Sequence, residues 1–344
     1  MSERFIWDSY SDQPHIIRDR SFRKSVRKKH LKSYARMVLK SLFILPFATL
    51  VMKLFKGKQK LTNREMMGLC VNLDKGARQV DLVEELGVQN LLMRVFLDQN
   101  IDEFVEFAKL FRGKSIVINI IQDRKFIENE ELLRDKLDEI FSKFDQTSSE
   151  FVIGNAINRL KWGFFSVDEY IEFYKIAKRL RDASYPHIKL IAPSVIDFEY
   201  YYNADVMFGS GDITFDKTSA LLYVDRRGSP KNSQYGIFDL KNKIDLLYAL
   251  VRLSPKTKSD EIYITEVNWP ISNTAPYAPT SEKECVSLEE YTLYMQEYME
   301  VARKSGKVSR VFWHQLVATG YGLVDGRDGT RYPQFYKFKE LLND

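Results

Sequence analysis

The chain of 344 residues is long enough to bury one large core, and its composition, 44% hydrophobic and 29% charged, is that of an ordinary globular protein. Cys70 and Cys285 match no metal or redox spacing and are expected to be free, buried thiols, and the four histidines form no HxxxH or HExxH pair. These features argue against a disulfide scaffold, a metal site and a bound cofactor. Residues 1–60 hold 15 Lys/Arg against 4 Asp/Glu, a balance of +11, so the other 284 residues carry −6 of the total +5. We therefore expect a basic arm over residues 1–60 and a mildly acidic domain over residues 61–344.

The basic arm combines a positively charged segment with an apolar one. Nine Lys/Arg lie between Arg18 and Arg36, and an apolar stretch follows from Met37 to Phe55. Its uncharged centre, residues 41–52, is 12 residues long, whereas a bilayer span needs about 20. No signal-peptide cleavage pattern follows it. We predict that residues 18–60 bind a membrane surface, with apolar side chains at the lipid boundary and Lys/Arg facing anionic lipid. Two alternatives are a tilted or uncleaved signal anchor, and a helix packed on the domain beside a solvated basic tail.

After Lys60, short apolar runs alternate with amphipathic helical stretches, the pattern of repeated βα units. The predicted strands are Met67–Asn72, Asn90–Phe96, Ser115–Ile121, Phe151–Gly154, Lys189–Ala192, Ala220–Val224, Glu261–Thr265 and Ser309–Trp313. The predicted helices include Ile101–Phe111, Asn129–Phe144, Val167–Ala183, Lys241–Arg252 and Leu288–Ser305. Eight strands with helical spacers predict an α/β fold, a closed (β/α)8 barrel (TIM barrel) preceded by the helical arm. No GxGxxG motif or P-loop follows a strand, which argues against a dinucleotide- or NTP-binding domain. The barrel has no pattern typical of a basic groove, so we do not expect a nucleic-acid partner.

In such barrels the chemistry lies in the loops that follow the C-terminal ends of the strands. The residues there are polar, charged or aromatic. They are Arg94 after strand two; Asn155, Ala156, Asn158, Arg159, Lys161 and Trp162 after strand four; Tyr223, Asp225, Arg226 and Arg227 after strand six; Glu266, Asn268 and Trp269 after strand seven; and Trp313 and His314 after strand eight. Aromatic rings beside hydroxyl-binding groups at one barrel mouth suit a carbohydrate substrate.

Arg94, Asn155, Tyr223, Glu266 and Trp313 stand in the order and at the strand ends where clan A glycoside hydrolases carry functional residues. Residues 65–344 resemble that clan, which places an Asn–Glu pair after strand four and a Glu after strand seven. The resemblance implies that Glu266 is a nucleophile attacking an anomeric carbon. Arg94 would keep it ionised, and Tyr223 would donate a hydrogen bond to it. Asn155 would bind the sugar 2-hydroxyl, and Trp313 would form the floor of the sugar subsite. The alternative to a catalytic role is that Glu266 is a structural residue that forms an ion pair with Arg94.

The chain departs from the clan at Ala156, where the acid/base glutamate is expected. Three interpretations remain open. Another group (Glu199, Asp225, Asp123 or His314) supplies the proton. The leaving group needs no proton, as with a phosphate-linked sugar, and the protein is a glycosyl transferase or transglycosidase. The barrel binds sugar without catalysis.

The remaining strand-end residues bear on the substrate. Arg159, Lys161, Arg226 and Arg227 predict an anionic sugar, because Lys and Arg bind phosphate or carboxylate, unless they pair with Asp225 or Asp123 instead. Trp162 and Trp269 either stack on sugar rings or pack in the core, and Asn158, Asn268 and His314 complete the predicted substrate contacts.

Three segments, IGNAINRLKWG, YVDRRGSP and ITEVNWP, are also similar to those of hydrolase-like proteins from bacterial surface-polysaccharide loci. That resemblance implies a role in lipopolysaccharide or capsule metabolism, on a surface glycan or its lipid-linked precursor. We therefore expect the protein at the cytoplasmic face of the bacterial inner membrane, or in the cytoplasm.

Overall fold

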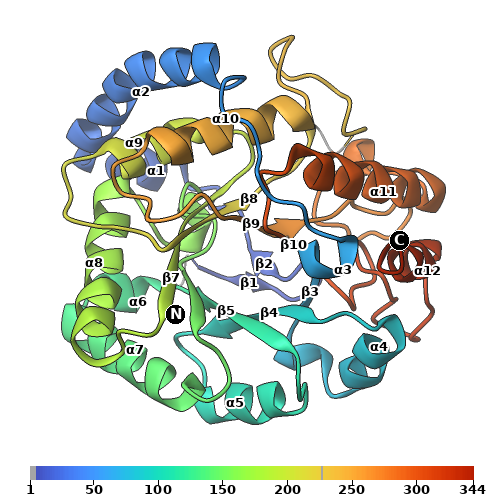
Figure 1. Ribbon diagram of the computed structural model, residues 1–344. Helices are drawn as coiled ribbons and strands as arrows, with labels where there is room; N and C mark the ends of the chain where they lie inside the picture. The colour runs from blue at the N-terminus through green and yellow to red at the C-terminus, as the bar shows by residue number, and fades with distance from the viewer. Residues whose placement is uncertain (1–4, 226–227) are drawn as a thin grey trace.

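Eight parallel strands close into a barrel at the centre of the molecule (Figure 1). The computed structural model describes residues 5–225 and 228–344. The strands pair in the order β10–β3–β4–β5–β6–β7–β8–β9, and β10 also pairs with β9, which closes the sheet. They are β3 (Met67–Val71), β4 (Asn90–Phe96), β5 (Ser115–Ile121), β6 (Glu150–Ile153), β7 (Lys189–Ile196), β8 (Lys217–Leu221), β9 (Ile262–Val267) and β10 (Arg310–Trp313). The predicted (β/α)8 barrel is confirmed.

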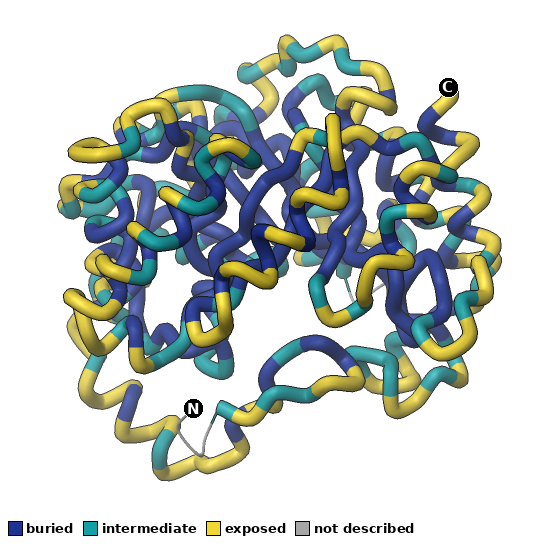
Figure 2. Tube along the Cα trace, turned by 90° about the horizontal axis from the view of Figure 1, so that it is seen from below, coloured by how far each residue is buried: buried dark blue, intermediate teal, exposed yellow. Residues whose placement is uncertain are grey.

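Helices surround the barrel, so buried residues lie in the middle of the molecule and exposed ones at its periphery (Figure 2). Side-chain caps fix several helix starts. The Ser287 hydroxyl accepts from the backbone N–H of Glu290, whose carboxylate accepts from the N–H of Ser287. The helices are α3 (Asn63–Met66), α4 (Arg78–Leu86), α5 (Ile101–Lys109), α6 (Arg124–Ile127), α7 (Glu130–Phe144), α8 (Val167–Ser184), α9 (Tyr200–Phe208), α10 (Leu240–Leu253), α11 (Leu288–Ser305) and α12 (Pro333–Leu341), with the short 3-10 turns η1 (Leu73–Lys75), η2 (Leu160–Trp162) and η4 (Glu282–Glu284).

The barrel interior contains a cluster of buried side chains that come from seven of the eight strands. They are Cys70, Leu92, Val117, Val152, Ile191, Tyr263 and Phe312. Because side chains alternate along a strand, their neighbours face outward and form a second, larger core with the helices. This alternation decides which strand-end residues point into the mouth of the barrel.

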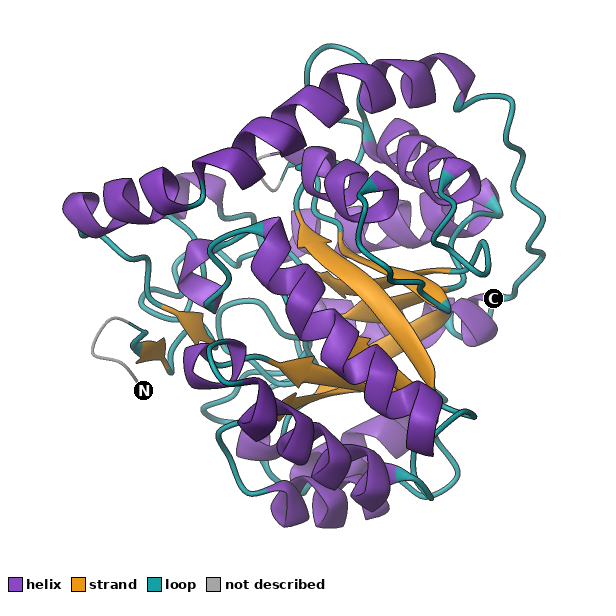
Figure 3. Ribbon diagram, turned by 90° about the vertical axis from the view of Figure 1, so that its left-hand side faces the viewer, coloured by secondary structure: helices purple, strands orange, loops and turns teal. Residues whose placement is uncertain are grey.

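The arm forms a two-stranded hairpin, β1 (Trp7–Asp8) and β2 (Gln13–Pro14), and then the helices α1 (Arg20–Lys29) and α2 (Leu31–Val51). The hairpin lies at the end of the barrel to which the strand arrows point (Figure 3). The arm therefore contributes to two places on the molecule: its first residues lie over the barrel mouth, and α2 lies against α9 and α10.

Two charged side chains of α2 reach the helices that surround the barrel. Arg36 and Lys40 both pair with the fully buried Asp205 of α9, at 3.1 and 2.9 Å. Lys53, just past the helix, pairs with Asp245 of α10 at 2.6 Å.

Its outward face carries large apolar residues. They are Leu31, Val38, Leu39, Leu42, Phe43, Phe47 and Leu50, and Leu54 follows in the next turn; each is more than half exposed. Among the described residues, α2 is the one helix long and apolar enough to cross a membrane, and only 17% of its apolar window is buried.

Candidate active site

Glu266 lies near the end of β9 and is held by two donors. The guanidinium of Arg94 on β4 forms an ion pair with its Oε2. The hydroxyl of Tyr223, which follows β8, donates to its Oε1 over 2.6 Å. All three side chains are buried. The two side chains predicted to flank Glu266 therefore contact it, and both contacts are of the kind that stabilises an ionised carboxylate.

Glu266 lines a cavity of 170 Å³ in the barrel mouth. Ala156 is part of the same wall, so a methyl group stands where the resemblance places the acid/base glutamate. Ligand pockets usually measure about 300–1,000 Å³, so this cavity holds only a small part of a saccharide. A second cavity of 480 Å³ lies beside it. The residues that line both are Asp12, Arg94, Lys161 and Trp162.

The N-terminal hairpin closes over the cavity through Asp12 and Gln13, which the sequence analysis missed. The Asp12 carboxylate accepts from Gln315 at 2.6 Å and from the Tyr321 hydroxyl at 2.8 Å. It also pairs with Lys75 at 2.9 Å. These partners are up to 309 positions away in the chain, and no local pattern could have connected them to Asp12.

Of the predicted cations, Arg159 and Lys161 line the cavity. Arg159 pairs with Asp197 at 2.6 Å and with Glu199 at 2.7 Å, so its charge is balanced, though not by Asp225 or Asp123 as considered from the sequence. Lys161 donates from Nζ to Gln13 Oε1 over 2.5 Å. Arg226 and Arg227 lie outside the described residues.

Asn155 and Asn158 anchor the loop after β6 through hydrogen bonds to neighbouring segments. Asn155 is buried outside the cavity wall, and its backbone N–H and C=O are both bonded to the side chain of Gln122, at 2.8 Å each. Asn158 donates to Ile196 O at 2.9 Å and to Glu199 at 2.7 Å. In this conformation neither side chain reaches the cavity beside Glu266.

Trp313 and Trp269 are packed between the barrel and α11. Their rings stack with centroids 5.8 Å apart, and Trp313 Nε1 donates to the Tyr291 hydroxyl over 2.7 Å. Neither lines the cavity. The reason is strand alternation: Phe312 faces into the barrel, so Trp313 faces out. The predicted subsite floor is thus not formed by Trp313.

Trp162, Asn268 and His314 do line the cavity. Asn268 donates to the backbone carbonyl of His314 at 2.7 Å. Burial, reinforced by the nearby positive charge of Arg94, lowers the pKa of His314 to about 3, so this imidazole is neutral near pH 7. Asp225 is half-buried and is not part of the wall.

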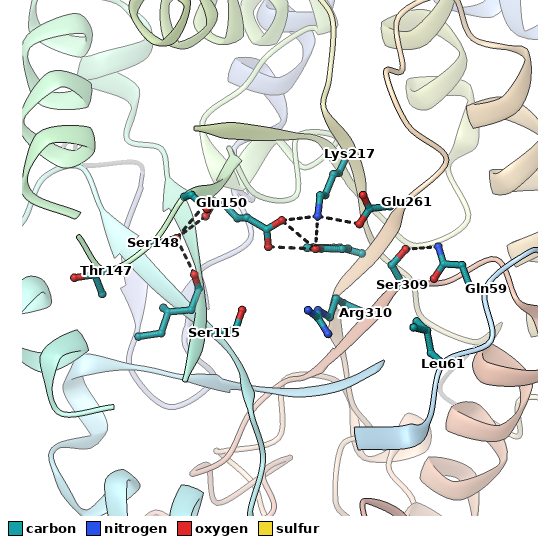
Figure 4. Close-up of a pocket in the computed structure, with 13 residues that line it drawn as sticks. Gln59, Leu61, Ser115, Thr147, Ser148, Glu150, Lys217, Glu261, Ser309 and Arg310 are labelled. Atoms are coloured by element: carbon teal, nitrogen blue, oxygen red, sulfur yellow. Dashed lines mark hydrogen bonds and ion pairs between the residues drawn. The ribbon is translucent and has the colours of Figure 1, made fainter. Parts of the chain in front are cut away.

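Another cavity, of 620 Å³, opens at the opposite, N-terminal end of the strands (Figure 4). Its charged groups neutralise one another: Lys217 pairs with Glu150 at 2.5 Å and with Glu261 at 2.9 Å. Residues at this end of a (β/α)8 barrel support the fold, whereas the opposite end carries the chemistry. Within residues 5–225 and 228–344 no group of three or more His, Cys, Asp or Glu is arranged to hold a metal ion.

The protein is a (β/α)8 barrel. At the C-terminal ends of its strands, the carboxylate of Glu266 forms an ion pair with Arg94. Comparison with solved structures gives similar barrels. They are the family 1 β-glucosidase of Thermotoga maritima (TM-score 0.57, 9% identity, covering 83% of this chain and 99% of that chain), a glucosidase of Croceicoccus marinus (0.61, 15%, 83% and 68%) and the GH39 enzyme of Xanthomonas axonopodis pv. citri (0.59, 12%, 83% and 67%). The resemblance to clan A glycoside hydrolases is confirmed at the level of the fold. No family model and no curated protein matches the sequence.

Proposed function

We propose that the protein acts on glycosidic bonds, with Glu266 as the nucleophile. The observation that carries this proposal is the position of Glu266, which faces a cavity in the barrel mouth while Arg94 and Tyr223 bind its two oxygens. A carboxylate fixed in this way attacks an anomeric carbon and forms a glycosyl-enzyme. The barrel fold shared with glucosidases supports the same reaction class.

The proposed substrate is a bacterial surface glycan or its lipid-linked precursor. The resemblance of three loop segments to proteins of surface-polysaccharide loci supports this choice. The 480 Å³ cavity supports it too, because it extends the site beyond the unit bound at Glu266. Its walls combine aromatic rings such as Trp7 and Phe96 with carboxylates such as Asp98 and Glu103, the combination that binds sugar faces and hydroxyls.

Transfer from an activated sugar is the second candidate function, and the observation that favours it is Ala156. A methyl group donates no proton, and a general acid contributes about 10²–10⁴-fold to rate. A phosphate-linked sugar would leave without one. A non-catalytic carbohydrate-binding role in polysaccharide assembly is the outcome if no turnover is found.

The test is covalent trapping with a panel of 2,4-dinitrophenyl 2-deoxy-2-fluoroglycosides, whose leaving group needs no acid. We expect mass spectrometry to locate the label on Glu266, and Glu266→Gln to abolish both labelling and turnover. Glu261→Gln is the matched control, because it changes the same residue type on the same segment at the far end of the barrel. Turnover by Glu266→Gln at the wild-type rate would remove Glu266 as nucleophile, and the absence of any label or turnover across the panel would favour the binding role.

We also propose that the arm holds the protein on an anionic membrane surface, at the cytoplasmic face of the inner membrane. Large apolar residues cover the outward face of α2, and exposing a contiguous apolar surface to water is unfavourable. The basic residues of α1 lie next to this face along the chain and are largely exposed. Flat insertion fits better than a span, because a span would take Arg36 and Lys40 away from Asp205 and into hydrocarbon.

A further inference from the structure

The loop after β6 presents Ala156 to the cavity where an acid/base group is expected. Any glycosidic oxygen bound over Glu266 that is a poor leaving group needs a proton from elsewhere in the mouth. The two tyrosine hydroxyls of the mouth are already engaged, because Tyr223 donates to Glu266 and Tyr321 donates to Asp12.

The carboxylates of the mouth are each engaged by other side chains of the protein. Asp12 is bound by Lys75 and by two neutral donors, Gln315 and Tyr321. Its carboxylate oxygens are therefore engaged by the protein.

Asp197 and Glu199 share the guanidinium of Arg159, at 2.6 and 2.7 Å. The pKa of His314 is lowered to about 3 by burial, so its ring carries no acidic proton near neutral pH. Asp123 accepts from the backbone N–H of Lys125 at the start of α6 and lines the neighbouring cavity instead.

Lys161 differs from all of these. It lies five residues after Ala156 in the same loop, on η2, and lines the same cavity as Ala156 and Glu266. Its Nζ donates to a neutral oxygen, Gln13 Oε1, over 2.5 Å. No carboxylate of the described residues lies within 4.0 Å of it, in contrast to Arg94 and Arg159.

The loop holds Lys161 in place from both sides. The N–H of Trp162 donates to Arg159 O at 2.8 Å, and Gln122 donates to Trp162 O at 2.8 Å. The Trp162 ring is buried against Trp7 of the hairpin. The backbone on either side of the ammonium group is therefore anchored.

The surroundings of Lys161 also bring its pKa closer to neutral pH. Burial lowers the pKa of Lys161 to about 8; Glu266, Asp8 and Asp197 act against this, whereas Arg159 adds to it. The other charged or titratable groups of the four cavities that Lys161 lines are Asp12, His15, Arg18, Asp19, Arg23, Arg27, Tyr34, Asp74, Arg94, Asp98, Glu103, Asp123, Arg124, Glu199, Tyr201, Tyr202, Tyr223, His314 and Tyr321. An acid with a pKa near the working pH is protonated there and still transfers its proton readily.

We infer that Lys161 is the proton donor that replaces the missing glutamate, and this inference rests on the proposed function. Glu266 attacks the anomeric carbon, the bond from that carbon to the leaving oxygen breaks with its electron pair, and that oxygen takes a proton from Lys161 Nζ. In the second step the neutral amine accepts a proton from the attacking water or acceptor hydroxyl, whose oxygen bonds to the anomeric carbon. The bond to Glu266 then breaks, which restores the carboxylate and the ammonium. The leaving glycosidic oxygen would take the position of Gln13 Oε1 and accept the hydrogen bond that Lys161 Nζ donates there.

The test compares wild type with Lys161→Arg and Lys161→Met on two glycosides of the sugar that labels Glu266, one with a 2,4-dinitrophenyl and one with a methyl leaving group. Arginine keeps the positive charge but does not release its proton near neutral pH. We expect both variants to lose about 10²–10⁴-fold in kcat/KM on the methyl glycoside and only a few-fold on the dinitrophenyl glycoside. The fall in wild-type methyl-glycoside activity above about pH 8 should vanish in both.

Three outcomes overturn the inference. Retention of methyl-glycoside activity by Lys161→Arg, with loss in Lys161→Met, makes Lys161 an anion anchor. Equal loss on both glycosides in variants with wild-type thermal unfolding makes it a structural residue. A panel with no labelling of wild type refutes the proposed function itself, and the proton donor with it.

Discussion

The exposed apolar face of α2 makes membrane binding a quantitative prediction. Phe43, Phe47 and Leu50 are 72%, 56% and 82% exposed. Fully burying such a side chain is worth about 1.5–3 kcal/mol, so their exposed parts amount to roughly 3–6 kcal/mol, and flat insertion that covers about half of this area yields roughly 1.5–3 kcal/mol. Replacing all three by Gln, which has a helix propensity close to that of Leu, should weaken partitioning onto vesicles about ten- to a hundredfold.

The assay is co-sedimentation of the full chain with phosphatidylcholine vesicles, with and without phosphatidylglycerol. We expect binding to require the anionic lipid and to weaken as salt rises from about 0.1 to 1 M, because the Debye length falls from about 10 to 3 Å. The matched control replaces Leu110, Leu132 and Leu293 by Gln, since these leucines are exposed elsewhere on the protein. If the α2 triple variant binds like wild type, or if the control loses as much, the outward face of α2 is not a membrane-binding surface.

Two further predictions concern the ion pairs that hold α2 on the barrel. Asp205→Asn removes the charge that faces Arg36, so limited trypsin digestion should cut the arm several-fold faster while the barrel stays folded; unchanged cleavage would mean that apolar packing alone holds the helix. Burial raises the pKa of Asp245, but hydrogen bonds from Lys307 and Lys53 outweigh it and lower the pKa to about 2. A depressed carboxylate pKa gives stability that is present above about pH 4 and lost as pH falls toward 2. Thermal unfolding of Asp245→Asn should therefore vary less than wild type across that interval.

The barrel was predictable because its strands are apolar runs of the right length between amphipathic helices. The differences occur where an apolar run and a strand do not coincide. The sequence predicts a fifth strand that ends at Ala192, before Pro193, whereas β7 continues to Ile196 after a register shift between Ala192 and Val195. The predicted sixth strand, Ala220–Val224, begins three residues later than β8, because the apolar run Leu221–Val224 remains buried beyond the end of that strand.

The candidate site was predictable where it depended on strand ends and not where it depended on distant segments. Arg94, Tyr223 and Glu266 lie within two residues of the C-terminal ends of β4, β8 and β9, and parallel strand ends of a barrel meet at one mouth. Trp313 also ends a strand, but one step of alternation turns it toward the helices. Asp12 could not be predicted, because its partners in the mouth are 63 to 309 positions away in the chain.

The hairpin connects the two proposals about this protein. Pro14 ends the hairpin over the mouth, and α1 begins at Arg20, so the connecting segment spans at most about 21 Å. If α1 and α2 lie on an anionic surface, the cavity at Glu266 is held within reach of the lipid headgroups. A saccharide joined to a lipid anchor is then presented beside its site, whereas a free saccharide gains nothing from the membrane. Anionic vesicles should therefore raise turnover of a lipid-linked glycoside and leave turnover of its soluble counterpart unchanged. If vesicles leave the turnover of the lipid-linked glycoside equal to that of the soluble one, membrane binding by the arm does not contribute to the reaction at Glu266.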